Sequence, residues 1–188
     1  KKKKIFSKRL FLCCGAPYSL NLIKKSNYLK KKFNQDFHFH PMIKLIAKFP
    51  EKVNSITNTN VINTQISEFY PNYLFGNAAS NLEFLKIFAL GNNRALKDVE
   101  NNYNYMSIFH VTYSLGTSSF VNLPYIDQNI IRYKFSKNEL KIIKEGLHKI
   151  INFIFECGAE YIYIQDRKIS KVNKLTNYQE VIDNYKYN

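Results

Sequence analysis

The sequence lacks the long apolar runs and the short signature motifs that mark several common classes of protein. None of its 188 residues belongs to an apolar stretch near the roughly 18–20 residues of a membrane-spanning helix, so we expect no span. The start is basic, as in a signal peptide, but the apolar stretch behind it is too short and no A-x-A-like site follows. G-x-G-x-x-G, Walker A, G-x-S-x-G and H-E-x-x-H are all missing, so the residues alone reveal no complete active site.

Cysteine is scarce, which limits the metal and redox chemistry that the chain could support. The three cysteines, Cys13, Cys14 and Cys157, form no C-x-x-C motif and no disulfide framework. We predict that all three are buried, reduced thiols of a cytoplasmic protein. His38 and His40 have the i, i+2 spacing of a metal pair on a strand, but no third ligand stands at a fixed spacing, and we predict no metal site.

Acidic residues are few. Lysine and arginine number 28 against 14 aspartates and glutamates, a formal charge of +14, and Asp36 is the only acidic residue before Glu51. One interpretation is a basic module that binds nucleic acid or another polyanion. The other is a general bias toward Lys, Asn, Ile, Tyr and Phe along the whole chain, and we favour it because neither an RRM-like aromatic pattern nor zinc-finger spacing is present.

What the chain does contain is enough apolar material for a core, at 45% hydrophobic and 15% aromatic residues. Residues 106–116 alternate between apolar and more polar positions, the pattern of a half-buried strand. Apolar runs predict further strands over 5–14 and 42–49. We expect helices over 17–26 and 79–90 and a helical turn or two over 94–104. We expect a long loop or an irregular helix over 51–67, a loop over 69–77, and a polar segment with weak patterning after Asp166.

The segment 130–164 predicts a strand, a helix and a second strand. Ser136 and Glu139 have the spacing of a capping box, and Gly158 suits the position after the helix. One face of this helix should pack on a sheet that contains 106–116 and the 130–135 strand, and His148 should lie at its boundary in a structural role. The apolar stripe consists of Leu140, Ile143, Leu147, Ile150, Ile151 and Ile154. Together these elements predict an α+β fold.

Three segments resemble the glucose–methanol–choline (GMC) family of flavin-dependent oxidoreductases. FLCCGAPYSLNLIKKSN is similar to the signature G-A-x-x-T/S-P-x-L-L-x-x-S-G, although leucine replaces its proline and asparagine its last glycine. DFHFHPM resembles N-L-x-D-H-P in its final His-Pro. RYKFSKNELKIIKEGLHKIINFIFECGAEYIY resembles the strand and long helix found late in bacterial members.

This resemblance implies a division of the chain. Residues 1–40 would end a flavin-binding α/β domain, and 41–165 would form a substrate-binding domain with a largely antiparallel sheet backed by helices. Residues 166–188 would be a polar C-terminal segment that could lead back to the flavin domain. It also implies that the dinucleotide fingerprint lies upstream of Lys1 and the catalytic histidine downstream of Asn188.

The resemblance further implies a function, the oxidation of an alcohol by hydride transfer to FAD. The 188-residue chain alone would then be inactive, without a catalytic base, and its partners would be a small alcohol and the remaining parts of the polypeptide rather than a specific nucleic acid. His110 and Tyr113 would contact the substrate, although from the residues alone we favour a structural role for His110. The residues expected near the cofactor are Gly15, Ala16, Ser19, His40 and Pro41.

Overall fold

The computed structural model describes residues 3–26, 37–54, 64–122, 129–132, 135–165, 169–175 and 178–185. The chain divides into two compact units. Residues 1–39 and 116–134 form unit 1, and residues 40–115 and 135–188 form unit 2. Unit 2 contains most of the buried core, and it carries the candidate site discussed below.

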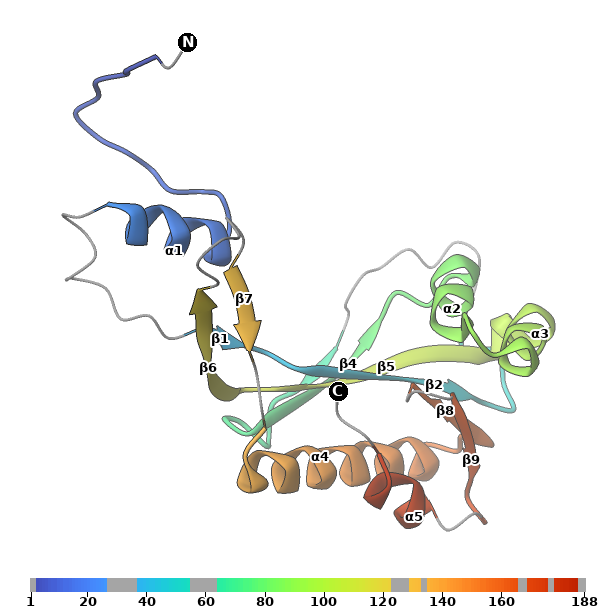
Figure 1. Cartoon of the computed structure of the whole chain (residues 1–188). Helices are drawn as coiled ribbons and strands as arrows, with labels where there is room; N and C mark the ends of the chain where they lie inside the picture. Colours follow the sequence, from blue (N-terminus) through green and yellow to red (C-terminus); the bar gives the residue numbers. More distant parts are fainter. Residues whose placement is uncertain are drawn as a thin grey trace. The chain divides into compact units, whose positions relative to one another are not determined.

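Unit 2 is built on a six-stranded sheet with the order β3-β4-β5-β2-β8-β9 (Figure 1). Every pair of neighbouring strands is antiparallel, so the predicted α+β fold with an antiparallel sheet and helices is confirmed. The strands are β2 (Met42–Lys48), β3 (Gln65–Ile66), β4 (Tyr73–Ala78), β5 (Met106–Tyr113), β8 (Tyr161–Ile164) and β9 (Ser170–Asn173).

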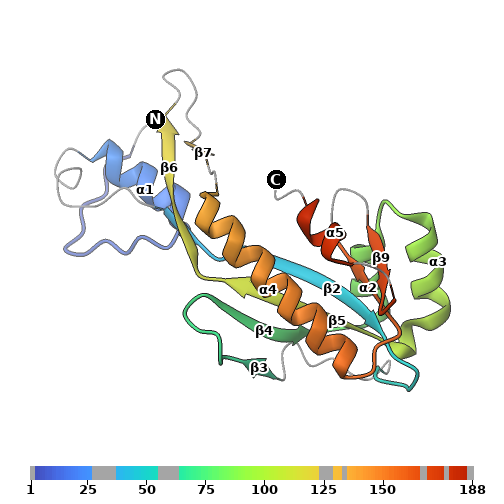
Figure 2. The same ribbon diagram turned by 90° about the horizontal axis from the view of Figure 1, so that it is seen from below.

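Helices cover both faces of this sheet. On one face α4 (Lys137–Glu156) runs along β2 and β5, with α5 (Tyr178–Asp183) beside it (Figures 1 and 2). On the other face lie α2 (Leu82–Ala89) and α3 (Asn93–Asn102), and the 3₁₀ turn η1 (Tyr103–Tyr105) leads from α3 into β5. Two buried clusters result, one under α4 and α5 and one under α2 and α3.

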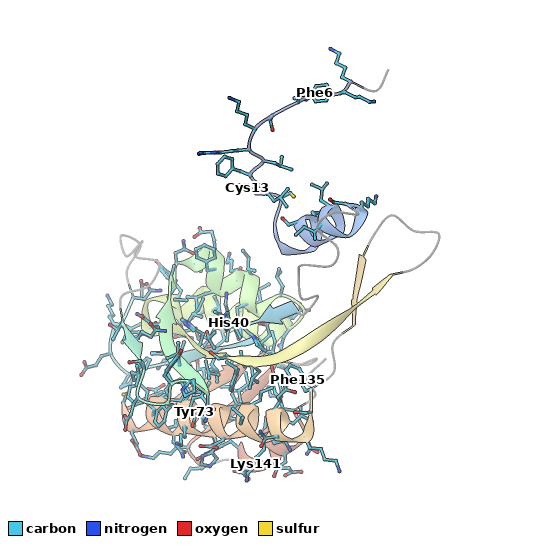
Figure 3. All side chains as sticks on the ribbon, turned by 90° about the vertical axis from the view of Figure 1, so that its left-hand side faces the viewer. Phe6, Cys13, His40, Tyr73, Phe135 and Lys141 are labelled. Carbon is cyan, nitrogen blue, oxygen red and sulfur yellow. The ribbon has the colours of Figure 1, made fainter. Side chains whose placement is uncertain are left out.

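The long helix α4 confirms the sequence prediction in detail. Ser136 and Glu139 form the capping box, and Gly158 follows the helix with a φ of 93°, which favours glycine. The predicted stripe is buried except for Leu140, which is half-buried. Lys141 lies on the exposed side of the helix (Figure 3). His148 is half-buried, with its Nδ1 3.2 Å from the Asn152 amide nitrogen.

Unit 1 contains α1 (Ala16–Lys25) and a three-stranded sheet with the order β1-β6-β7. Its strands are β1 (Phe37–Phe39), β6 (Leu115–Asn122) and β7 (Asn129–Arg132). The predicted 17–26 helix is thus confirmed, but the predicted 5–14 strand is wrong. Among the described residues this segment pairs with no strand, and Phe6 and Cys13 lie exposed on it (Figure 3).

The burial expected of the cysteines is wrong for the same reason. An apolar run forms a buried strand only when neighbours cover it, and the segment around Cys13 and Cys14 has none among the described residues. Cys157 is exposed as well, since it stands at the end of α4. All three thiols are free.

Three further expectations need correction. The strand before α4 joins β6 in the smaller sheet rather than the larger sheet, since its register runs along Ser119–Asn122. The expected 69–77 loop contains β4, which pairs along β5. After Asp166, where no regular structure was expected, β9 pairs with β8 and α5 packs beside α4.

Candidate ligand-binding site

A cavity of about 350 Å³ opens on the α2 side of the six-stranded sheet. Its floor comes from β2, β4 and β5, and one wall comes from α2. Most of the described lining is apolar, and none of the lining residues that the structure describes is acidic. The lining residues are Met42, Lys44, Ala78, Ala79, Phe84, Ile87, Phe88, Ile108, His110 and Gln165. The volume falls at the lower end of the range typical of small-molecule sites, roughly 300–1,000 Å³.

The register of the sheet places three residues in one row across the floor. His110 on β5 lies opposite Gly76 of β4 on one side and opposite Lys44 of β2 on the other. Residues paired in this way point to the same face of an antiparallel sheet, with Cβ atoms about 4.5–5.5 Å apart. The ammonium-bearing side chain of Lys44 and the His110 imidazole therefore stand side by side on the α2 face.

Gly76 leaves the space that the imidazole needs. A Cβ atom on Gly76 would lie 2.8 Å from both Cε1 and Nε2 of His110. Such a distance is shorter than van der Waals contact permits, so any larger residue would displace the ring. The φ of Gly76 is not in the left-handed region, and the close approach of the ring is what calls for glycine here.

His110 is the buried polar group of this cavity. It is 7% exposed, and its Nδ1 has no hydrogen-bond partner in the described part of the chain. Burial lowers the pKa of the imidazole below its ordinary value, and the positive charge of Lys44 lowers it further. At neutral pH the ring is therefore uncharged, with one nitrogen that donates a hydrogen bond and one that accepts.

The wall is held in place by two polar side chains that directly precede α2. Asn81 caps α2 by accepting a hydrogen bond from Phe84 N at 2.9 Å, and the Ser80 hydroxyl accepts one from Ile108 N on β5 at 2.8 Å. Leu85 and Phe88 anchor the helix in the core below it. Phe84 and Ile87 remain 49% and 60% exposed beside the cavity. These two side chains give the cavity an accessible apolar edge.

The two predicted substrate contacts do not line one cavity. His110 faces α2, whereas Tyr113 belongs to the cluster under α4 and is fully buried. The Tyr113 hydroxyl donates a hydrogen bond to the Ile143 carbonyl at 2.7 Å, and a Cβ on Gly146 would lie 2.8 Å from its ring. In this arrangement Tyr113 fastens α4 to the sheet.

The residues predicted to contact FAD fall in both units. Gly15, Ala16 and Ser19 lie at the start of α1 in unit 1, where the Ser19 N–H donates to the Gly15 carbonyl at 2.9 Å. His40 and Pro41 precede β2 in unit 2. The Tyr113 N–H donates a hydrogen bond to the Pro41 carbonyl at 2.9 Å, which extends the β2–β5 ladder by one bond. The His40 side chain also lies at this end of the ladder, with its Nδ1 3.3 Å from the backbone carbonyl oxygen of Tyr113.

The described contacts at the start of α1 are those of a turn that leads into a helix. Gly15 adopts a φ of 79°, which favours glycine. No described atom lies within 4 Å of the position that a Cβ would take, so the backbone turn, and not a close contact, explains the glycine. We therefore assign no chemical step to FAD in this part of the chain. The described segments also contain no group of three or more His, Cys, Asp or Glu residues that could hold a metal ion.

The sequence did not single out Lys44 or the α2 wall. One signal was present at the even positions of 42–48, which all point to the same face of the sheet. Lysines alternate there with apolar residues, and this face is too polar to be fully covered. The four residues are Met42, Lys44, Ile46 and Lys48. That pattern indicates a face that is open in part. Its pairing with His110, however, depends on the register of two strands far apart in the sequence.

No protein-family model matches this sequence, and no curated protein matches it significantly. Across the described helices, none is both long enough and apolar enough to cross a membrane.

Proposed function

We propose that this chain forms the substrate-side part of an FAD-dependent oxidoreductase of the GMC type, which oxidises an alcohol group by hydride transfer to flavin. The observation that carries this proposal is the cavity on the α2 face, apolar but for a buried, uncharged imidazole and a few polar groups. An apolar pocket with a few converging polar groups is the usual form of a small-molecule site. The dinucleotide fingerprint and the catalytic base would come from other parts of the polypeptide, and this chain would add a few contacts to the flavin.

The chemistry of His110 suits a hydroxyl ligand. A neutral imidazole both donates and accepts hydrogen bonds, as an alcohol does, and none of the described residues is a hydrogen-bond partner of the His110 Nδ1. Leaving such a buried group unpaired costs about 1–3 kcal/mol, so a ligand that satisfies it gains affinity. His110 would therefore bind and orient the substrate, which is a positioning role.

A cytoplasmic location is part of the same proposal. The three cysteines are free, and two of them, Cys13 and Cys14, are adjacent and exposed. Free exposed thiols suit a reducing compartment.

The direct test is to express the complete open reading frame that encodes this sequence and to examine the purified protein for bound flavin. We expect one flavin per chain, and we expect its visible absorption to bleach when an alcohol is added without oxygen. His110→Gln should weaken alcohol binding, whereas Lys141→Met, on the exposed side of α4, should not. The 188-residue chain alone should hold no stoichiometric FAD and should not oxidise alcohols.

Two outcomes would contradict the proposal. One is a complete protein that purifies without flavin and cannot bind it. The other is tight, sequence-selective RNA binding at physiological salt, which would favour the basic-module interpretation instead. Under our proposal any binding to nucleic acid is weak, independent of sequence and lost as salt rises.

A further inference from the structure

The polar groups of the α2-face cavity differ in charge. Lys44 is exposed at the cavity and carries the positive charge, while the neighbouring His110 is buried and neutral. Among the described residues no carboxylate lies within ion-pairing distance of Lys44, although five other lysines have such partners. The described lining residues include no acidic side chain. From the described residues, a ligand in this cavity therefore meets one positive charge and no negative charge.

The spacing of these two groups limits the ligand further. Lys44 and His110 are a directly paired couple on β2 and β5, so their side chains rise from neighbouring positions on the floor. A ligand that uses both needs its hydroxyl and its anionic group close together. In a 2-hydroxy acid these two groups stand on adjacent carbons.

The remaining surface of the cavity is apolar. Ile108 and Met42 contribute to the floor, and Phe84, Ile87 and Phe88 contribute to the wall on α2. Phe84 and Ile87 are exposed enough that a ligand side chain covering them would remove apolar area from water. This surface favours an aromatic or aliphatic side chain over a sugar.

We propose that the α2-face cavity binds a 2-hydroxy carboxylic acid with an apolar side chain, its hydroxyl at His110, its carboxylate near Lys44 and its side chain against α2. This inference rests on the proposed function, because it names the class of alcohol that would be the substrate. It goes beyond that function in predicting selectivity by charge: anionic alcohols bind best, neutral ones less well and cationic ones worst.

Four probes that share a phenyl ring test this order on the 188-residue chain by calorimetry. Mandelate has the hydroxyl and the carboxylate. In 1-phenyl-1,2-ethanediol the carboxylate is replaced by a neutral group, and in 2-amino-1-phenylethanol by a cationic one. Phenylacetate keeps the carboxylate but lacks the hydroxyl. We expect mandelate to bind about 1.5- to 5-fold more tightly than the diol, the range of an exposed ion pair. The amino alcohol should bind most weakly of the three alcohols, and phenylacetate more weakly than mandelate.

Matched variants locate the effect. Lys44→Met, at an exposed position where folding should be unaffected, should remove the preference for mandelate over the diol, while Lys141→Met on the opposite side of the sheet should preserve it. His110→Gln should reduce the difference between mandelate and phenylacetate. In NMR spectra of the histidine rings, mandelate should shift the His110 signals.

Several results would overturn the inference: equal or reversed binding order, a charge preference that survives Lys44→Met, no binding by any probe, or unchanged His110 signals. A dimer that forms through α2 and is dissociated by Ile87→Glu would also overturn it, because the second copy would then cover the apolar wall. If the expected order appears but the complete protein has no flavin, the proposed function fails and the site stands. If the complete protein oxidises cationic alcohols as well as anionic ones, only this inference fails.

Discussion

The imidazole of His110 occupies the space that a side chain at Gly76 would need, since a Cβ there would lie 2.8 Å from Cε1 and Nε2. The two residues are direct partners on β5 and β4. The glycine thus sets where the buried imidazole of the cavity lies, and a change at Gly76 should alter the site without adding or removing any polar group.

Gly76→Ala should therefore weaken ligand binding more than it weakens the fold. We expect a loss of about 1–3 kcal/mol in the free energy of unfolding, the usual cost of overpacking, together with a clear loss of mandelate affinity. Urea unfolding and calorimetry on the same variant give both numbers. A variant that binds mandelate as the wild type does would show that the ring position is unimportant.

The protonation of His110 should make the fold sensitive to mild acid. Burial, and then the charge of Lys44, hold the pKa of the folded imidazole below its ordinary 6.5, so the unfolded chain binds more protons when the pH falls below that value. The stabilising effect is full above pH 6.5 and is lost as the pH drops toward the lower folded pKa.

His110→Gln should flatten this part of the pH profile, measured as the free energy of unfolding in urea from about pH 8 to pH 5. Lys44→Gln removes the repulsion and should make the acid loss smaller than in the wild type. An identical slope in wild type and His110→Gln would contradict this assignment.

Asp98 ties α3 to the strands β8 and β9. One of its oxygens accepts hydrogen bonds from the hydroxyls of Tyr161 and Tyr163, both at 2.7 Å, and the other accepts from the Asn102 amide at 2.8 Å. The Lys171 Nζ lies 3.5 Å from the Asp98 oxygen that the two tyrosine hydroxyls share. Burial alone would raise the pKa of Asp98, but the three hydrogen bonds and Lys171 outweigh it and lower the pKa.

Asp98→Ala should cost about 1–3 kcal/mol of unfolding free energy, because two tyrosine hydroxyls lose their acceptor. Glu100→Ala on the same helix, which breaks only an exposed pair with Lys86, should change it by less than about 0.5 kcal/mol. Thermal and urea unfolding of the two variants give the comparison, and equal effects would show that the Asp98 contacts add no stability.

The same cluster predicts a loss of stability in alkali. Burial, and then the Asp98 carboxylate, raise the pKa of Tyr161 and of Tyr163 above the ordinary 10.0. Their contribution is therefore full below pH 10.0 and is lost as the pH rises above it, when the unfolded tyrosines ionise first. In Asp98→Ala this alkaline loss should be smaller, and an unchanged loss would contradict the assignment.

The packing of α4 gives the most direct test of the fold. Leu147 is fully buried against the sheet, so Leu147→Ala should cost about 2–5 kcal/mol. Lys141→Ala, on the exposed side, should change the unfolding free energy by less than about 0.5 kcal/mol. Similar effects of the two substitutions would mean that α4 does not bury this face.

Sequence patterns predicted those elements whose signals are local. In α4 the capping box at Ser136, the apolar stripe and Gly158 all agree, and each acts within a few residues of itself. The alternation in 106–113 likewise predicted β5. Elements whose signals lie elsewhere in the chain were missed or misread. β4 contains Gly76 and Asn77, which resemble loop residues, and it is a strand because β5 pairs along it.

The candidate site was predictable only in part for the same reason. His110 stood out as a histidine on a strand, but its neighbours Lys44 and Gly76 come from two other strands and meet it only through the register of the sheet. The apolar run before Gly15 shows the opposite error. Its composition predicts a buried strand, yet burial requires partners, and no partner strand lies along it among the described residues.

The central claim is that the cavity on the α2 face binds the substrate, and a crystal structure of the protein with mandelate tests it most directly. We expect mandelate in that cavity, with its hydroxyl within hydrogen-bonding distance of the His110 imidazole, its carboxylate toward Lys44 and its phenyl ring against Ile87. Mandelate bound elsewhere on the protein, or an empty cavity at saturating mandelate, would contradict the account.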